Sequence, residues 1–293
     1  MRSAGAITEG DWAGSDARQG APARSGAWLA TAADGLLAVR RQLRYLSGYL
    51  EVGRHAPVPR LTDFGRCGRP VLLLHGFFAT RRTLDVLERR LRRDGYCVFS
   101  LNLGGLARTF NTRSIRDLAR FVRLKVERIY QRNPALGALS IVGHSMGGLI
   151  GAYYVKELDG ARRAHTLVTL GMPYHGTPVA YAALPLGILA RSLWQMAPTS
   201  QFIRELRPSA WPRGVQVTSL YSRADRVARF PSPLVETGTP GLRNVEVDAR
   251  GHREFLYRKR VYDAILRALR NGEAGADEAG PAAAATATDR RGP

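Results

Sequence analysis

Short apolar runs alternate with amphipathic segments along most of the chain, from residue 70 to residue 270. A continuous apolar run of about five residues is typical of a strand buried on both faces of a parallel sheet. Apolar residues at intervals of three and four are typical of a helix that packs on one side. The predicted strands are the run that begins at Pro70 and is ended by Gly76, then 96–101, 139–142, 166–170, 215–221 and 245–247, and the predicted helices are 82–93, 114–131, 146–158 and 253–270. This alternation predicts an α/β fold with a mostly parallel, doubly wound sheet.

The regular alternation stops at an apolar, proline-punctuated insert, residues 173–212. One interpretation is that its apolar side chains form ordinary core. The other is a cap or lid that covers a functional site and presents an apolar face to a hydrophobic substrate. Because the insert follows directly after a predicted strand, we favour the cap.

The two ends of the chain differ in composition from the α/β region, 70–270. Residues 1–26 are rich in Gly, Ala, Ser and Asp without periodicity, and residues 271–293 in Ala, Gly and Thr, so we expect both to be disordered. The segment 27–69 combines an amphipathic helix, from Trp28 to Val52, with a connector that contains several prolines and glycines. Such a helix either lies on a membrane surface or packs on the core, and its few arginines favour packing.

The charge of the chain limits the classes of partner that it is expected to bind. At 293 residues and 45% hydrophobic, the chain is long enough for one sizeable domain, and its formal net charge is +20. Residues 81–132 hold 14 basic and five acidic residues. Basic surfaces of this kind bind nucleic acid, anionic membranes or acidic substrates. No nucleic-acid motif or aromatic interleaving accompanies the arginines, so nucleic acid is not expected. Two interpretations of the basic residues remain: a solvated arginine-rich surface, or a peripheral contact with an anionic membrane.

Two further features bear on the compartment. No stretch reaches the roughly 18 apolar residues of a membrane-spanning helix, and Glu9, Asp11 and Asp16 take the place of the basic start of a signal peptide. The default expectation is a cytoplasmic protein, with membrane association or export by another route as alternatives.

Cys67 and Cys97 fit neither a metal site nor a disulfide framework, and a bridge between them requires that their backbones lie side by side.

The most specific motif is Gly-His-Ser-Met-Gly at residues 143–147, between an apolar strand and an amphipathic helix. A sharp turn of this kind strains the central serine, and it needs Gly143 and Gly147 where a Cβ would strike the neighbouring elements. Ser145 is thereby placed at a helix N-terminus, which favours a developing negative charge. The motif predicts the nucleophile elbow of a serine hydrolase.

A serine nucleophile requires a base and an acid that orients it, in the chain order serine, acid, histidine. Of the histidines after Ser145, His165 begins a strand and His175 leaves no room for an intervening acid. His252 follows the last predicted strand on a glycine-containing loop, so we predict it as the base. The acid should follow a strand, and Asp225 does so after 215–221.

Other side chains compete for the acid or complete the site. Glu236 and Asp248 are the alternatives to Asp225, and Asp248 is disfavoured because it lies only four residues before His252. Two backbone donors must hold the oxyanion. The predicted donors are Met146, which follows the serine, and Phe77, which we place ahead of Phe78. We expect His75 and His144 to be packed residues that hold their turns. The predicted substrate contacts are Phe78, His144, Tyr174, Leu186 and Trp194.

These residues together resemble the α/β-hydrolase superfamily, and within it bacterial triacylglycerol lipases and related esterases. The resemblance covers about residues 70–270. It rests on His75-Gly76-Phe77, the Gly143–Gly148 elbow, Gly171-Met-Pro-Tyr-His-Gly-Thr177, Ser222-Arg-Ala-Asp225 and Gly251-His252. It implies an α/β-hydrolase fold with an apolar cap or lid and hydrolysis of carboxylic esters without a cofactor. Unlike most secreted relatives the chain shows no signal peptide, and no acidic cluster matches the structural calcium site of some of them, so no metal is expected.

The predicted function is therefore a serine hydrolase, a lipase or esterase that cleaves acylglycerols or other lipid-like esters through an acyl-enzyme on Ser145. The same three residues would also serve an acyltransferase or a thioesterase. A third alternative is a catalytically silent hydrolase fold that binds anionic membranes. The pattern does not indicate an oligomeric state.

Overall fold

The computed structural model describes residues 64–65, 67–77, 79–103, 113–182, 191–236 and 238–279. All of them belong to one compact unit, Leu43–Pro293, and the other unit, Met1–Gln42, is outside this range. Several sequence predictions therefore fall outside the described residues. These are the disordered segment 1–26, the helix within 27–69, the contacts Phe78 and Leu186, and the part of the tail after residue 279.

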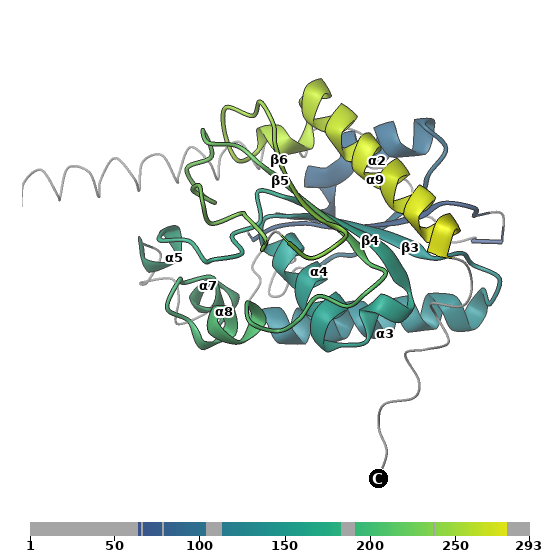
Figure 1. The fold of residues 1–293 in the computed structure, drawn as a ribbon, viewed down its shortest axis with the longest axis horizontal. Helices are drawn as coiled ribbons and strands as arrows, with labels where there is room; N and C mark the ends of the chain where they lie inside the picture. Colours follow the sequence, from purple (N-terminus) through teal and green to yellow (C-terminus); the bar gives the residue numbers. More distant parts are fainter. Residues whose placement is uncertain are drawn as a thin grey trace, which may run out of the picture. The chain divides into compact units, whose positions relative to one another are not determined.

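Six parallel strands form one sheet in the order β2-β1-β3-β4-β5-β6 (Figure 1). They are β1 Pro70–Leu74, β2 Cys97–Ser100, β3 Leu139–His144, β4 Ala164–Leu170, β5 Gln216–Tyr221 and β6 Leu242–Glu246. The chain moves from β1 to one edge at β2 and then crosses to β3 on the other side of β1. Ligand sites of open α/β sheets lie at the carboxyl ends of the strands where the order reverses in this way. Here that point is between β1 and β3.

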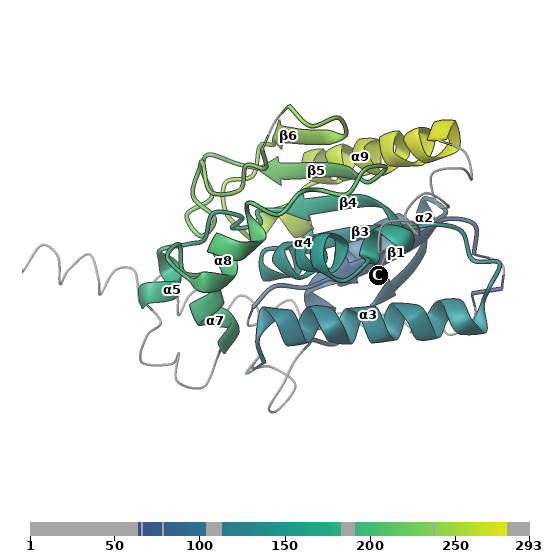
Figure 2. The same ribbon diagram turned by 60° about the horizontal axis from the view of Figure 1, so that its bottom comes forward.

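Helices cover both faces of the sheet (Figures 1 and 2). The described α-helices are α2 Asp85–Arg93, α3 Ile115–Arg132, α4 Met146–Glu157, α5 Val179–Ala182, α7 Arg191–Gln195, α8 Gln201–Leu206 and α9 Lys259–Ala279. Short 3-10 turns are η2 Arg81–Leu84, η4 Gly160–Arg162 and η5 Glu254–Leu256. Helices α3 and α4 pack on one face, and α2 and α9 on the other. The doubly wound, parallel α/β architecture predicted from the sequence is confirmed.

The buried strands serve two cores at once. Along β1, Leu72 and Leu74 belong to the core under α3 and α4, whereas Val71 and Leu73 belong to the core under α2 and α9. All four side chains are fully buried. Successive side chains of a strand point to opposite faces, so a strand with helices on both sides has to be apolar at every position. This requirement explains the continuous apolar runs in the sequence.

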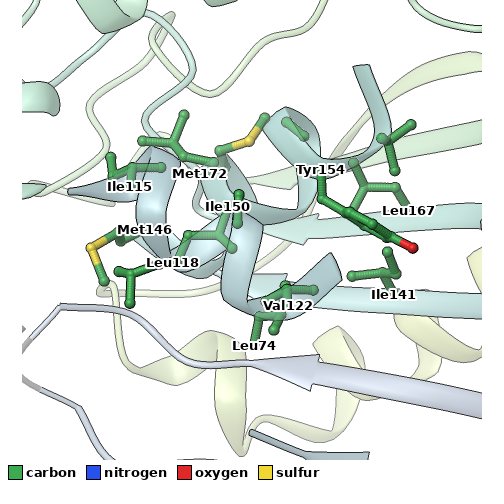
Figure 3. Packing of buried hydrophobic residues seen from close by; sticks show 14 of the residues in the cluster. Leu74, Ile115, Leu118, Val122, Ile141, Met146, Ile150, Tyr154, Leu167 and Met172 are labelled. Atoms are coloured by element: carbon green, nitrogen blue, oxygen red, sulfur yellow. The ribbon is translucent and has the colours of Figure 1, made fainter. Parts of the chain in front are cut away.

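The core between the sheet and α4 holds the nucleophile helix firmly (Figure 3). Figure 3 shows Tyr154 of α4 beside Ile141 of β3 and Leu167 of β4, and all three are buried. Burying apolar side chains such as those of Ile141 and Leu167 contributes about 1.5–3 kcal/mol each to the stability of the fold. The position of α4, and of the serine that precedes it, is therefore fixed by the core.

The last helix differs from the prediction of 253–270. A 3-10 turn, η5, occupies Glu254–Leu256, and α9 then runs from Lys259 to Ala279. Residues 271–279 thus continue the helix, and the predicted start of a disordered tail at 271 is wrong.

Two contacts explain the longer helix. Gly272 lies against β4 so closely that a Cβ would collide with the side chain of Thr166. The Arg69 side chain forms a two-point ion pair with Glu273, with Nε 3.0 Å from Oε1. Neither contact follows an apolar period, so hydrophobic patterning does not detect this part of the helix.

Cys67 and Cys97 form a disulfide, with their Cα atoms 5.7 Å apart. The sequence left this pairing open. Cys97 begins β2 opposite Pro70 of β1, and its N–H donates to the carbonyl of Arg69. The backbone before β1 therefore runs beside β2, which is the arrangement that a bridge requires.

The described part of the insert 173–212 contains α5, α7 and α8. Its apolar side chains Leu193, Met196, Phe202, Ile203 and Leu206 are buried in the core with α3 and α4. The N–H of Ile115, at the start of α3, donates to the side chain of Gln195. Much of the insert is thus ordinary core. Of the large hydrophobic side chains in this described part, Trp194 and Tyr181 are exposed, at 42% and 38%.

Among the helices that the structure describes, none combines the length and the apolar character needed to cross a bilayer.

Candidate active site

Ser145 occupies the turn between β3 and α4 with φ 55° and ψ −123°, a conformation that is rare for a residue with a side chain. Its N–H donates to the carbonyl of Leu170 at the end of β4, over 2.9 Å. The serine is 8% exposed. The strained turn predicted from the motif is therefore present, and β4 holds it from the side.

The two glycines of the motif permit this close approach. A Cβ on Gly143 would lie 2.6 Å from the carbonyl oxygen of Gly147, and one on Gly147 would collide with the carbonyl of Leu74. Real Cβ atoms do not come this close to backbone. The helix α4 can therefore start directly above β1 and β3 only because both positions lack a side chain.

Asp225 and His252 form a buried pair on the loops after β5 and β6. The Nδ1 of His252 lies 2.7 Å from Oδ2 of Asp225, and the two side chains are 1% and 0% exposed. The other carboxylate oxygen, Oδ1, accepts from the N–H groups of Val227 and Ala228, at 2.8 and 3.2 Å. An ionised carboxylate only accepts, so the proton of a neutral His252 resides on Nδ1, and Nε2 carries the lone pair.

Contacts of His144 and Gly171 show that the pair of Asp225 and His252 lies beside the turn at Ser145. His144, which precedes Ser145, has Nε2 2.9 Å from the carbonyl oxygen of His252, and the two rings lie 4.7 Å apart. Gly171, which follows the carbonyl that holds Ser145, has φ +55°. A Cβ there would lie 2.8 Å from Asp225 Oδ2 and 3.1 Å from His252 Nδ1. Serine, histidine and aspartate therefore gather at the carboxyl ends of β3, β4, β5 and β6.

The loop after β1 lies against the serine from the other side. Leu74 pairs with Gly143 in the sheet, and a Cβ on Gly76 would lie 3.0 Å from Cβ of Ser145. Phe77 follows and packs, half-buried, against the core. Phe77, the predicted second oxyanion donor, is therefore on a loop that lies against Ser145.

His75 holds this loop in place. Its Nε2 accepts from the N–H of Leu103, and its Nδ1 donates to the carbonyl of Gly76, both at 3.0 Å. The side chain is fully buried, and burial lowers the pKa of His75 to about 4. It is therefore neutral near pH 7 and connects the loop after β1 to the loop after β2.

Met146, the other predicted oxyanion donor, is the first residue of α4 and is fully buried. The first N–H groups of a helix have no partner within the helix and carry its positive dipole end. The N–H groups that begin α4 therefore lie directly after Ser145.

Tyr174, His144 and Trp194, the predicted substrate contacts that the structure describes, have three different environments. Tyr174 is fully buried, and its hydroxyl accepts from Nζ of Lys156 at 2.9 Å, while its ring lies near Trp211. Burial raises the pKa of Tyr174 and lowers that of Lys156 to about 8. Tyr174 is thus a packing residue, contrary to the prediction of a substrate contact. His144 contacts His252, and Trp194 is exposed on α7.

The competing acids and bases are occupied elsewhere. Asp248 pairs with Arg258 at 2.8 Å and its side chain is 55% exposed. Glu236 is exposed at the surface. The ring of His165 lies 3.3 Å from the Ser140 hydroxyl, and His175 donates to the carbonyl of Leu234. None of these contacts involves Ser145.

Sequence reasoning missed the role of Gly171 and the clamp on Asp225. A signal for the clamp was present, because an aspartate often accepts from N–H groups two and three residues later in a turn. Gly171 carries no comparable signal, since its positive φ and its contact with the pair appear only in three dimensions. Within the described residues, no three His, Cys, Asp or Glu side chains group closely enough to hold a metal ion.

The reversal of strand order at β1 and β3, together with a strained serine at the end of β3, defines an α/β-hydrolase. A family model described as serine aminopeptidase, S33, matches residues 68–246. That is more than half of the chain, and the protein belongs to this family.

Solved structures of lipases share the fold. Aspergillus fumigatus lipase B is 19% identical with a TM-score of 0.58, and the match covers 74% of this chain and 55% of that one. The chain thus spans little more than half the length of that lipase. The mature Bacillus licheniformis lipase BlEst2 is 16% identical with a TM-score of 0.54, covering 73% and 96% of the two chains. Paleococcus ferrophilus monoacylglycerol lipase is 15% identical with a TM-score of 0.55, and the match covers 70% of this chain and 97% of that one.

Proposed function

We propose that the protein is a serine hydrolase that cleaves carboxylic esters through an acyl-enzyme on Ser145. The observation that carries this proposal is the buried contact between Asp225 and His252, 2.7 Å long, beside the strained turn that presents the serine. An acid that orients a histidine next to such a serine is the arrangement that acyl transfer requires. The family match supports a hydrolase.

In the first half of the reaction, Ser145 Oγ bonds to the ester carbonyl carbon as Nε2 of His252 accepts its proton. The carbonyl oxygen becomes an anion that the N–H groups of Met146 and Phe77 stabilise. The bond between the carbonyl carbon and the alcohol oxygen then breaks, and His252 returns the proton to the alcohol. In the second half, His252 takes a proton from water, the resulting hydroxide bonds to the acyl carbon, and Ser145 leaves with the proton.

Asp225 has two tasks in this scheme. It holds Nδ1–H of His252 so that the lone pair of Nε2 points away from the carboxylate, and its negative charge stabilises the imidazolium that forms. The N–H groups of Val227 and Ala228 fix its other oxygen. The carboxylate therefore keeps one orientation throughout the cycle.

For the substrate, we favour acylglycerols or other lipid-like esters. The structures with this fold include proteins described as lipases and a monoacylglycerol lipase, and the insert exposes the large ring of Trp194. The family description, serine aminopeptidase, supports a second candidate, the cleavage of an N-terminal amide by the same residues.

One substrate panel separates the two candidates. p-Nitrophenyl esters with acyl chains of two to sixteen carbons are compared with amino-acid p-nitroanilides, with the wild type and Ser145→Ala. We expect ester turnover with kcat/KM well above that for any anilide and no turnover by the variant. Faster anilide cleavage would support the peptidase, and ester turnover by the variant would refute the role of Ser145.

The fate of the acyl group needs a separate measurement, because the same residues serve an acyltransferase or a thioesterase. Products are quantified with an ester or an acyl thioester as donor, with and without a competing alcohol. The proposal expects free acid as the main product from the ester. A transferred ester as the main product would assign an acyltransferase.

A further inference from the structure

His144 has an unusual environment for a histidine next to a nucleophile. It is 1% exposed, and its Nε2 lies 2.9 Å from the carbonyl oxygen of His252. A carbonyl only accepts, so Nε2 of His144 carries a hydrogen. Burial, and next the charge that His252 can carry, keep the pKa of His144 well below its ordinary value. His144 is therefore a neutral donor.

The environment of Nδ1, the other ring nitrogen, shows that stability does not explain why position 144 is a histidine. With the hydrogen on Nε2, Nδ1 is an acceptor, and it has no hydrogen-bond partner among the described residues. It faces Gly76, where a Cβ would approach it to 3.3 Å. A buried acceptor without a partner costs about 1–3 kcal/mol, whereas an apolar side chain of similar size would avoid that cost.

The hydrogen bond of His144 joins the end of β3 to the loop that carries His252. On the loop that carries His252, the carbonyl of Ala249 accepts from Ser222 after β5, and that of Asp248 accepts from Arg258. These contacts fix the loop to its own side of the site. The contact from His144 fixes it to β3, one residue from Ser145.

We propose that His144 is a positioning residue for the base: its N–H holds the backbone of His252 so that the imidazole stays between Asp225 and Ser145. This inference rests on the proposed function. The neutrality of His144 is part of it, because a second cation 4.7 Å from the His252 ring would oppose the imidazolium that forms during attack. A misplacement of about 1 Å at a reacting group can cost about 100-fold in rate.

The test compares three variants. His144→Met removes the donor at similar size, and His144→Gln keeps a donor near the position of Nε2. His175→Met is the matched control, since it removes a similar bond, 3.0 Å long, from a histidine to the carbonyl of Leu234 outside the site. Active sites are counted with a fluorophosphonate, and kcat, KM and the unfolding temperature are measured with a p-nitrophenyl ester as substrate.

For His144→Met, we expect kcat per active site to fall about 10- to 100-fold, with KM unchanged and the unfolding temperature not lowered. His144→Gln should keep kcat within about threefold of the wild type, and His175→Met should leave kcat unchanged. Equal kcat in His144→Met and the wild type, or an equal loss in the Met and Gln variants, would overturn the inference. His144→Phe, which keeps a planar ring, replaces the Met variant if that does not fold.

The failure of the proposed function gives a different result. In that case the wild type itself neither reacts with the fluorophosphonate nor turns over the ester. An active wild type with an unaffected His144→Met variant refutes the positioning role alone.

A second inference rests on the outer side of α3, which lies along one edge of the part of the chain that the structure describes (Figure 2). Between Ile115 and Arg132 the helix has six basic and two acidic residues. Arg120, Arg123 and Arg128 are exposed, and Leu124 among them is 58% exposed.

The two acidic side chains of α3 do not balance this charge. Asp117 pairs with Arg120 at 3.2 Å and Asp159 with Arg123 at 3.8 Å, both in exposed contacts of little strength, and Glu127 pairs with Arg163 at 2.9 Å. We infer that this face binds an anionic phospholipid bilayer, with the arginines on the headgroups and Leu124 inserted between them. Each cation near such a surface contributes about 1 kcal/mol, and an exposed apolar side chain adds to this by burial in the interface.

Vesicle sedimentation tests this surface without any need for catalysis, with the Ser145→Ala protein. We expect binding to vesicles that contain phosphatidylglycerol, weaker binding at high salt, and little binding to pure phosphatidylcholine. Replacing Arg120, Arg123 and Arg128 by Gln should weaken binding at least tenfold. The control replaces Arg213, Arg243 and Arg267, which are exposed elsewhere, and loses the same charge.

Leu124→Ser should weaken binding while leaving its salt dependence unchanged. Equal losses in the two triple variants would mean that net charge alone is responsible, and would overturn the assignment of this face. So would an absence of binding to anionic vesicles, or a preference for nucleic acid added as a competitor.

Discussion

Nδ1 of His252 lies 2.7 Å from Oδ2 of Asp225, with both side chains almost wholly buried. The pair comes from two loops 27 residues apart in the chain, and it meets at the carboxyl end of the sheet beside Ser145. Such a contact fixes the tautomer of the histidine before substrate arrives. The chemistry that we propose depends on this relationship.

Replacing Asp225 by Asn tests the pair directly. An amide can donate to Nδ1, which would move the histidine proton to Nε2 and remove the base. We expect kcat to fall by about 10⁴-fold, with the fold intact. Asp248→Asn, which removes the competing acid, should keep kcat near that of the wild type. Comparable losses in both variants would show that the acid has been misassigned.

Gly171 should be essential for activity because a side chain there would strike the pair of Asp225 and His252. A Cβ there would lie 2.8 Å from Asp225 and 3.1 Å from His252, and its φ is +55°. Gly171→Ala should therefore lose most of its kcat as well as some stability. Gly214 has a φ of +82°, but a Cβ there would meet no neighbouring atom within 4 Å, so Gly214→Ala should lose only about 1 kcal/mol of stability. Full activity of Gly171→Ala would show that the pair can move without consequence.

Buried neutral histidine makes the fold sensitive to acid. The pKa of His75 is lowered to about 4 in the folded state, while the unfolded chain titrates near 6.5. Between these values the unfolded state binds more protons, so the free energy of unfolding falls as the pH drops from 6.5 to 4. The contribution is about 3 kcal/mol. It is fully present above pH 6.5.

Urea unfolding at pH 7 and pH 4.5 measures this loss, with His75→Gln for comparison. The difference in stability between the wild type and the variant should shrink at the lower pH. A difference that is the same at both pH values would contradict a neutral His75.

The disulfide gives a prediction about thiol content. With Cys67 and Cys97 paired, the protein purified in air and then denatured should show no free thiol, and two after reduction. A bridge over this sequence separation stabilises a fold by about 2–4 kcal/mol. We therefore expect the reduced protein, and the Cys67→Ser variant, to unfold at lower urea concentration. Two free thiols before reduction would rule out the bridge.

Much of this structure follows from the sequence because it depends on local chemistry. The strand 70–74 is apolar at every position since both faces are covered, and this pattern is legible without coordinates. The elbow at Ser145 is equally local, because strand, turn glycines and helix are contiguous. The order of Asp225 and His252 after it follows from the requirement that each sit beyond its own strand.

What the sequence did not reveal depends on contacts between distant segments. The bond from His144 to the backbone of His252 joins residues 108 apart in the chain, and no pattern near either residue signals it. The end of α9 is held by Gly272 on Thr166 and by Glu273 on Arg69, neither of which is part of an apolar period. Tyr174 was predicted as a substrate contact, yet it is fully buried and its hydroxyl accepts from Lys156.

The central claim is that Ser145 is a nucleophile activated by His252. Reaction with a fluorophosphonate, followed by digestion and mass spectrometry, measures it most directly. We expect one label per chain on Ser145, no label in Ser145→Ala, and labelling of His252→Ala slowed by several orders of magnitude. A wild-type protein that remains unlabelled, or that carries the label on another residue, would contradict the claim.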